Sequence, residues 1–241
     1  MKKILMALMV LSFGTAWAGG NLIVNEYQAD PDATNGDANG DGTSSTTEDE
    51  FVELYNDTGV DLDVTGWTLA DGNSVRHTFP ANSIIPANCA LVVFSGGTPT
   101  GVFGNALVQT ASTGSIGLNN GGDSIIVNDG ISDVVNFSYG SEGGNNQALT
   151  RDPDVTGVTL VEHSTATGSG GALFSPGTQI DGTAFSGCPV VSDTPPAVDS
   201  TVPTDAATAI SINTQISINF DEPVDATAAA VTVTCDAVNQ P

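Results

Sequence analysis

The chain has 241 residues and a formal net charge of −24, with 28 acidic residues against four basic ones. Lys2 and Lys3 belong to its first segment, so the remainder carries only Arg76 and Arg151. Such an acidic surface is unsuited to direct binding of DNA or RNA, which requires clustered Lys and Arg. It favours carboxylates that hold divalent cations, or that keep the surface soluble in a salty medium.

The N-terminal segment predicts export. Lys2 and Lys3 precede an apolar run over residues 4–14, and residues 16–18 (AWA) give the small-x-small pattern that signal peptidase recognises. The run is shorter than the roughly 20 residues that span a bilayer as a helix, and no comparable run follows. We therefore predict a signal peptide over residues 1–18 and a secreted, extracellular or cell-surface protein without a membrane span.

Beyond the signal segment, the sequence predicts short β-strands joined by tight turns. Pro80 and Pro86 exclude a helix where they stand, and Asn-Gly and Asp-Gly turns between the later apolar runs are typical of hairpins. The predicted strands are residues 21–27, 51–55, 67–69, 75–79, 90–94, 115–118, 124–127 and 134–139, with weaker edge strands at 148–151 and 159–162. This spacing predicts an all-β sandwich.

A second β region follows. Residues 188–196 (CPVVSDTPP) have the prolines and small polar residues of a linker. Two short alternating strands are predicted over residues 209–220, and another at 231–235. Residues 197–241 are fewer than half of an immunoglobulin-like domain of about 100 residues. We therefore predict a first domain over residues 19–187 and an incomplete second β domain.

A long polar segment, residues 28–49, separates the first two strands and signals function or disorder. It contains the D-x-[DN]-x-[DN]-G-x5-E spacing of an EF-hand calcium loop. Calcium takes about six to eight hard oxygen ligands, and this spacing supplies them. The candidate ligands are the side chains of Asp37, Asn39 and Asp41, the carbonyl of Thr43, Ser45 through a water, and both carboxylate oxygens of Glu48.

The flanks of this segment differ from those of an EF-hand. Both are strand-like, and Pro31 lies just upstream, whereas an EF-hand needs two helices. We therefore predict a structural Ca²⁺ site in a loop inserted between two strands. Nearby carboxylates are candidates for additional ligands: Asp30, Asp32, Asp49 and Glu50. The alternative is a solvated Asn/Asp/Gly turn cluster that binds no metal.

No catalytic residue and no organic cofactor are predicted. The two histidines, His77 on an alternating surface face and His163 in a weakly patterned region, lie in no nucleophile or zinc motif. Carboxylate-only glycoside hydrolysis needs a cleft lined with aromatic residues, and Trp67 is better explained as core. Cys89 and Cys188 form either a disulfide or two free thiols, and a partner for Cys235 is expected outside this chain.

Residues 21–139 resemble the lamin-tail domain of bacterial secreted proteins. The matching segments are EFVELYN (50–56), LDVTGWTLAD (62–71), HTFP (77–80), IPANCALVVF (85–94), NNGGD (119–123) and DVVNFSY (133–139). The resemblance implies an immunoglobulin-like β-sandwich in which Phe51 and Trp67 face the core and Gly66 permits the turn before Trp67. Asn88-Cys89 departs from the family, which more often has glycine there.

Residues 195–241 resemble the start of a bacterial immunoglobulin-like domain of the S-layer-associated type, through a Pro-rich opening and FDEPV (220–224). Together the two resemblances imply a non-catalytic secreted binding or scaffold module whose ligand is an unidentified extracellular protein or glycan. The alternative is the N-terminal accessory region of a secreted nuclease of the endonuclease/exonuclease/phosphatase type, whose catalytic domain lies beyond residue 241.

Overall fold

The computed structural model describes residues 21–189, 197–211, 213–221 and 224, so the predicted signal peptide and the strand at 231–235 lie outside the described residues. The chain divides into two units, Met1–Val190 and Val191–Pro241. In its described part, strands and turns are joined by only two short 3-10 helices, η1 (Ser141–Gly143) and η2 (His163–Thr165). No described helix is long and apolar enough to cross a membrane.

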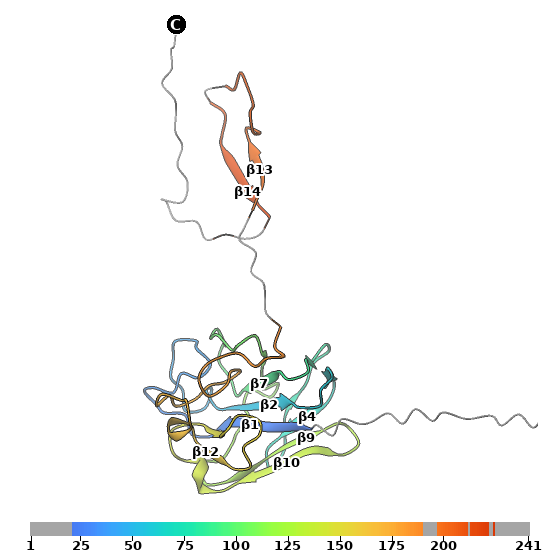
Figure 1. Cartoon of the computed structure of the whole chain (residues 1–241), viewed down its shortest axis with the longest axis vertical. Helices are drawn as coiled ribbons and strands as arrows, with labels where there is room; N and C mark the ends of the chain where they lie inside the picture. Colours follow the sequence, from blue (N-terminus) through green and yellow to red (C-terminus); the bar gives the residue numbers. More distant parts are fainter. Residues whose placement is uncertain (1–20, 190–196, 212, 222–223, 225–241) are drawn as a thin grey trace, which may run out of the picture. The chain divides into compact units, whose positions relative to one another are not determined.

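Two sheets form a sandwich in the first unit (Figure 1). The larger has the order β12-β11-β1-β2-β7-β8 and the smaller β10-β9-β4-β5. All pairs are antiparallel except β7 with β8. Their bounds are β1 Leu22–Gln28, β2 Phe51–Asn56, β7 Ala90–Phe94, β8 Leu107–Thr110, β11 Leu149–Arg151, β12 Leu160–Glu162, β4 Thr68–Ala70, β5 Val75–Thr78, β9 Asp123–Asn128 and β10 Asp133–Tyr139. A two-stranded pair, β3 (Leu62–Asp63) and β6 (Ile84–Ile85), accompanies them.

The inner faces of the two sheets make the main core. Alternate residues of β2, such as Val52 and Leu54, pack against Leu69 of β4 and Ile125 of β9. In strand β1 the inward-facing residues are Leu22, Val24 and Tyr27, so the alternation is interrupted where the pairing with β2 shifts at Asn25. This β-bulge changes which residues face inward. As a result Tyr27 lies in the core, while Glu26 and Gln28 lie on the outer face of the six-stranded sheet.

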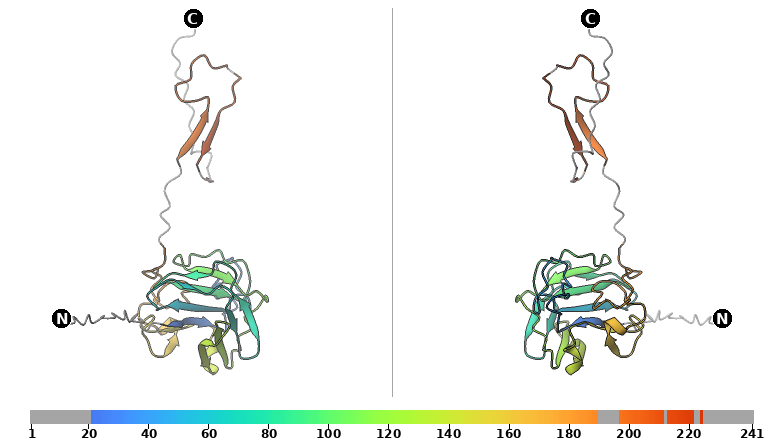
Figure 2. Two further views of the ribbon diagram at one scale, coloured as in Figure 1. Left: turned by 90° about the vertical axis from the view of Figure 1, so that its right-hand side faces the viewer. Right: turned by 90° about the vertical axis from the view of Figure 1, so that its left-hand side faces the viewer.

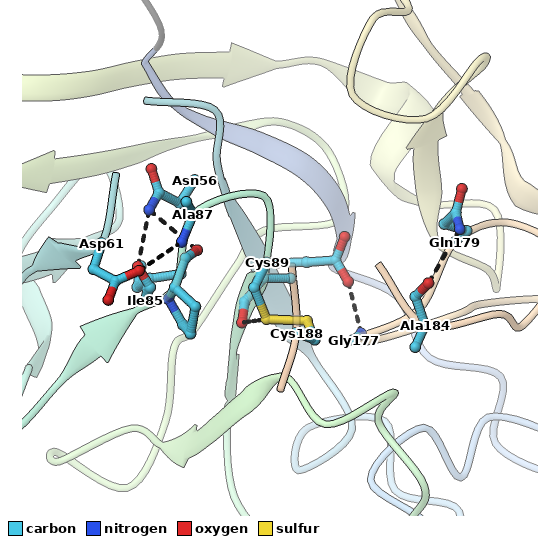
Figure 3. Close-up of a disulfide and its surroundings, with 12 residues drawn as sticks. Asn56, Asp61, Ile85, Ala87, Cys89, Gly177, Gln179, Ala184 and Cys188 are labelled. Carbon is cyan, nitrogen blue, oxygen red and sulfur yellow. Dashed lines mark hydrogen bonds between the residues drawn. A yellow bond between two sulfur atoms is a disulfide. The ribbon is translucent and has the colours of Figure 1, made fainter. Parts of the chain in front are cut away.

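That outer face is also buried, because the segment over residues 163–188, here called the strap, covers it. Phe174 of the strap packs on Phe51 and Phe94, and the Phe185 ring lies 5.0 Å from that of Tyr55. A disulfide between Cys89 and Cys188, with 4.6 Å between their Cα atoms, fixes the end of the strap (Figure 3). Figure 2 shows the sandwich of the first unit from two sides.

The predicted all-β sandwich and most of its strands are confirmed, and Ala90–Phe94 has the predicted bounds. The strand expected at residues 115–118 is wrong: these residues form no strand. Their N–H groups donate instead to side chains, Ile116 to Ser95 Oγ at 2.9 Å and Leu118 to Glu50 Oε2 at 3.2 Å. The short strands β3, β6 and β8 were not predicted.

The turn residues agree with the expectations. Gly66 has a φ of +78°, in the left-handed region that glycine enters without strain. Asn88, where the resembling family more often has glycine, has a φ of +58°. Asn is the residue after Gly that most readily adopts this conformation. The expectation for the aromatic pair is only partly met, since Trp67 is half-buried against the main core while Phe51 lies in the cluster under the strap.

The second unit contains an antiparallel pair, β13 (Val198–Val202) with β14 (Ser217–Phe220). Two strands were expected over residues 209–220, and only the later part forms one, since residues 209–211 have no strand structure. Strand β13 was not predicted, because VDSTV lacks a regular apolar alternation. Ala209 has a φ of +58°, a left-handed conformation that does not fit a strand.

Candidate calcium loop and adjoining pocket

The segment between β1 and β2 folds onto itself through its own side chains. Asp37 Oδ2 accepts the Gly42 N–H at 3.0 Å, Asn39 Oδ1 accepts the Asp41 N–H at 2.9 Å, and Asp41 Oδ1 accepts the Thr43 N–H at 3.0 Å. The last two bonds are turns begun by Asn or Asp, in which the side chain accepts the N–H two residues on, whereas the first spans five residues. Oxygens at alternating positions therefore fold this segment into one short coil, and their convergence on a metal ion stays a prediction.

Asp49 closes this coil from its far end. One carboxylate oxygen accepts the Asn39 N–H at 2.9 Å and the other accepts the Ser45 N–H at 2.7 Å. Burial raises the pKa of Asp49, the two N–H donors oppose this shift, and the charge of Asp37 adds to it. Asp49 was predicted as an additional ligand, but the structure gives it the role of tying the two halves of the loop together.

The loop is supported by the segment that follows β7. The Asn39 carbonyl accepts the N–H groups of Thr100 and Gly101 at 3.0 and 3.2 Å, and the Thr98 N–H donates to Asp41 Oδ2 at 3.2 Å. Gly97 has a φ of +72°, and a Cβ built there would collide with the Asn39 amide. Glycine is therefore required at this position for the two segments to meet.

The remaining predicted ligands lie at the surface of the loop. Thr43 and Glu48 are exposed, and the Ser45 hydroxyl accepts the Glu48 N–H at 3.1 Å. Within the described residues, no three Asp, Glu, His or Cys side chains gather as a metal-holding group. One oxygen stands out nonetheless, because Asp37 Oδ1 is buried and has no hydrogen-bond partner.

The other nearby carboxylates are engaged elsewhere. Asp30 Oδ2 accepts the Asn146 N–H at 3.2 Å, and Asp32 Oδ1 accepts that of Asn35 at 2.7 Å. Glu50 turns to the segment after β8, as described above, and burial raises its pKa to about 7. None of the three is turned toward the coil that carries the motif.

The loop also forms one wall of a pocket of about 450 Å³. Asp37, Ala38 and Gly40 line that side, and the strap lines the opposite side with Phe174 and other residues between 169 and 182. Most of the lining is apolar. The acidic loop therefore contributes part of the wall of this pocket.

A second acidic group was not predicted. Glu26 of β1 and Glu53 of β2 are cross-strand neighbours, fully buried beneath the strap. Glu26 accepts the Ser175 N–H at 2.8 Å and the Ser175 hydroxyl at 2.7 Å, while Glu53 accepts the Gly177 N–H at 2.6 Å. Asn25 Nδ2 donates to Glu53 at 2.8 Å. The two carboxyls thus anchor the strap to the sheet.

Burial sets the protonation of this pair. It raises the pKa of Glu53 well above its ordinary value, and the neighbouring Glu26 adds to the shift. It also raises the pKa of Glu26, an effect opposed by His163, whose Nε2 lies 3.8 Å from Glu26 Oε2. Two adjacent buried carboxyls cannot both ionise without a large penalty. The pair is therefore expected to keep a proton at neutral pH.

The histidines do not form a catalytic arrangement. His77, predicted on a surface face, is only 3% exposed, and this expectation is wrong. Strand β8 and the residues after it cover the ring: its Nε2 bonds to Gln109 Oε1 at 2.7 Å and its Nδ1 accepts the Ser112 N–H at 3.1 Å. His163 is fully buried and bonds to the Ala172 carbonyl. Neither ring bonds to a Ser hydroxyl or a Cys thiol in the described structure.

These features define a class: an immunoglobulin-like β-sandwich with an acidic surface loop and no assembled catalytic group among its described residues. A family model of the Lamin Tail Domain matches residues 15–141, and a model of a Bacterial Ig-like domain matches residues 192–241. The chain belongs to the lamin tail domain family, and its second unit contains the bacterial Ig-like domain. Both resemblances predicted from the sequence are confirmed. A search of curated proteins finds no match.

The lamin-tail match ends at residue 141, so β11, β12 and the strap lie beyond the matched residues. These elements supply the cover of the six-stranded sheet and one wall of the pocket.

Proposed function

We propose that this chain is an exported, non-catalytic binding module whose acidic loop is stabilised by Ca²⁺. Domains of the lamin-tail and bacterial Ig-like families suggest a binding or scaffold role, and the signal-like segment over residues 1–18 supports export. The observation that carries the calcium proposal is the coil from Asp37 to Thr43, whose buried Asp37 Oδ1 has no hydrogen-bond partner. An unpaired buried carboxylate oxygen is costly unless something binds it.

The donor set suits calcium. Asp37, Asn39 and Asp41 offer side-chain oxygens, Thr43 a carbonyl, Ser45 a hydroxyl that holds a water, and Glu48 two carboxylate oxygens. All are hard oxygen ligands, and the set includes neither the nitrogen nor the sulfur that softer metals prefer. Glu48 is exposed, and although its backbone carbonyl accepts the Gly96 N–H at 3.0 Å, its carboxylate accepts no hydrogen bond among the described residues and is free to turn toward the ion.

Calcium would act here by stabilising the acidic loop, which forms one wall of the pocket. The ion neutralises carboxylates that otherwise repel one another and fixes the coil that lines the pocket of about 450 Å³. The pocket then has a defined shape for an extracellular protein or glycan. The role of the ion is structural, and no chemistry on a substrate is assigned to it.

Thermal melts in Ca²⁺ and in EGTA test the proposal. A ligand at a hundredfold excess over its Kd stabilises by about 2.7 kcal/mol, which raises the Tm of a domain of this size by about 5–10 °C. Asp37→Asn should abolish that difference.

Asp129→Asn is the control, because Asp129, like Asp37, accepts backbone N–H groups in a turn: those of Ile131 and Ser132, between β9 and β10 and outside the loop. It should keep the full Ca²⁺ response. Identical midpoints of the unmodified protein in Ca²⁺ and in EGTA would sink the proposal.

A further inference from the structure

The two sheets of the sandwich do not end at the same place. Strand β10 lies over β1, where the Tyr27 ring is 5.7 Å from that of Phe137 and 4.5 Å from that of Tyr139. The six-stranded sheet continues past β1 with β11 and β12, whereas β10 is the last strand of the smaller sheet (Figure 1). In the described part of the chain, no strand faces the inner side of β11 and β12.

A groove of about 310 Å³ lies between β10 and strands β11 and β12. Its sides are Phe137 of β10 and Leu160 of β12, its floor includes Tyr27 and Leu149, and Val158 lies at the rim with 91% of its surface exposed. Tyr27 is fully buried, and its hydroxyl has no hydrogen-bond partner among the described residues. Ser138, Glu142 and Thr159 complete the lining, so the groove is mixed in character, with one unsatisfied polar group beneath it.

The edge of β10 is open to pairing. The strand has seven residues, DVVNFSY, with neither Lys nor Pro, and among the described strands only β9 pairs with it. Natural sheet edges usually carry such residues or a cover that blocks pairing with other chains. The other edge of the smaller sheet, strand β5, is covered by the segment after β8. The Thr113 N–H donates to the Arg76 carbonyl at 3.2 Å, and the Thr78 N–H donates to Ser112 Oγ at 3.0 Å.

Charge indicates what kind of strand fits. Glu142 lines the groove, and Glu162 ends the neighbouring β12. The whole chain has 28 acidic residues and only four basic ones, so a second copy of it would be repelled. A strand with basic ends would instead be attracted.

We infer that this groove binds an extended segment of a partner protein, which pairs with β10 as an additional strand and places alternate apolar side chains beside Phe137 and over the accessible Val158 and Leu160. Its flanking residues are basic. In such β-strand addition the main-chain hydrogen bonds supply affinity and the apolar pockets supply specificity. This surface is separate from the acidic loop, and its use does not depend on Ca²⁺.

The test uses the full chain and a synthetic nine-residue peptide of alternating valine and threonine with a lysine at each end. Binding is followed by NMR titration and by amide hydrogen exchange, in Ca²⁺ and in EGTA. We expect the β10 amides to gain protection under both conditions. A peptide with a central proline, which cannot pair with a strand, should bind at least about tenfold more weakly, and a peptide with glutamate ends should also bind more weakly.

A matched pair of variants places the site. Val158→Lys puts a positive charge at the rim of the groove, and Val102→Lys makes the same change at a residue 94% exposed, beside the other pocket. Neither side chain has packing to lose, so both variants should melt as the parent does. Val158→Lys should weaken the lysine peptide at least about tenfold, and Val102→Lys should leave it unchanged.

Three results would overturn the inference: no binding of the lysine peptide, equal binding of the proline peptide, or protection that appears on strands other than β10. Sedimentation of the chain alone as a dimer, with its β10 amides protected, would assign the groove to self-association and overturn it as well. A failed Ca²⁺ response with intact peptide binding would contradict only the calcium proposal.

Discussion

Acidic side chains occupy two contrasting regions of the first unit. In the loop from Asp37 to Asp49 most of them are partly or fully exposed and accept N–H groups of their own segment. Glu26 and Glu53 are fully buried and accept N–H groups of the strap, which is distant in sequence. The comparison shows that acidic side chains serve two different structural roles here: those of the loop fold their own segment, and the buried pair holds a distant one.

The largest expected effect comes from releasing the strap. The Cys89–Cys188 disulfide joins residues 99 apart in the sequence, and closure of a loop of about 100 residues is worth about 4.7 kcal/mol in the chain-entropy model. Cys89→Ser combined with Cys188→Ser should lower the unfolding free energy by about that amount and expose Glu26 and Glu53. Urea unfolding with Cys235→Ser as the control measures it. If the double variant unfolds at the parent midpoint, the strap is not held by this bond.

A smaller effect is expected from the buried pair itself. Glu26→Ala leaves the Ser175 N–H and hydroxyl without an acceptor, and each unsatisfied buried donor costs about 1–3 kcal/mol. We expect a loss of about 2–4 kcal/mol in urea unfolding.

Glu26→Gln is the control, since it keeps an acceptor oxygen and removes only the charge, and it should cost less than about 1 kcal/mol at neutral pH. Equal losses in the two variants would show that the carboxyl must be ionised, against the shared proton inferred here.

The pH dependence of the unfolding free energy should reveal the buried carboxyls, whose pKa values are raised. Burial raises the folded-state pKa of Glu26, Glu53 and Asp154, and that of Glu50 to about 7 from 4.5. A raised carboxyl pKa gives stability that is complete below the unfolded value and is lost as pH rises through the folded value. In EGTA, stability should therefore fall by about 1–3 kcal/mol between pH 5 and pH 7.

His77 makes the folded protein more stable as pH rises, which opposes the effect of the carboxyls. Burial lowers its pKa, so folding disfavours its charged form below pH 6.5. Its contribution reduces the slope without reversing it. The check is a set of urea unfolding curves across this range, in which Glu50→Gln should flatten the dependence. A stability that rises with pH over the same range would contradict the protonation assigned to the buried carboxyls.

The smallest expected effect concerns support of the loop. Gly97→Ala and Gly59→Ala both force a residue with a side chain to a positive φ, at +72° and +78°, at a cost of about 1 kcal/mol each. Only the Cβ at position 97 meets Asn39 and Asp41, whereas nothing lies near position 59. Calorimetric Ca²⁺ titration should therefore show weaker binding for Gly97→Ala alone. Equal Ca²⁺ affinities of Gly97→Ala and Gly59→Ala would show that the contact of position 97 with Asn39 and Asp41 does not support metal binding.

Much of the fold was predictable because local patterns match it. The ALVVF run gave β7 its bounds, and the alternation in DVVNFSY identified β10. The buried carboxylates were not predictable, because Glu26 and Glu53 occupy positions that alternation alone assigns to a solvent face. Only the strap buries that face, and it comes from residues with weak patterning. The same cause explains His77, whose cover is β8 and the segment after it.

The candidate site was predictable as a motif but not as a geometry. The spacing from Asp37 to Glu48 gave the turns that the structure has between strands. It did not indicate that Asp49 would close the coil or that Gly97 would support it, because both contacts depend on packing. The choice between a disulfide and two thiols at Cys89 and Cys188 also needed the fold, since only the strap brings them together. The nuclease alternative concerns residues beyond this chain and stays a prediction.

The central claim is that the acidic surface loop, and not the buried pair, receives a calcium ion. Isothermal titration of the full chain with Ca²⁺ tests this most directly. We predict one bound Ca²⁺ per chain, binding at least about tenfold weaker in Asp37→Asn, and binding unchanged in Asp129→Asn and in Glu26→Gln. Absence of a binding isotherm, or equal affinity in Asp37→Asn and the parent, would contradict the claim.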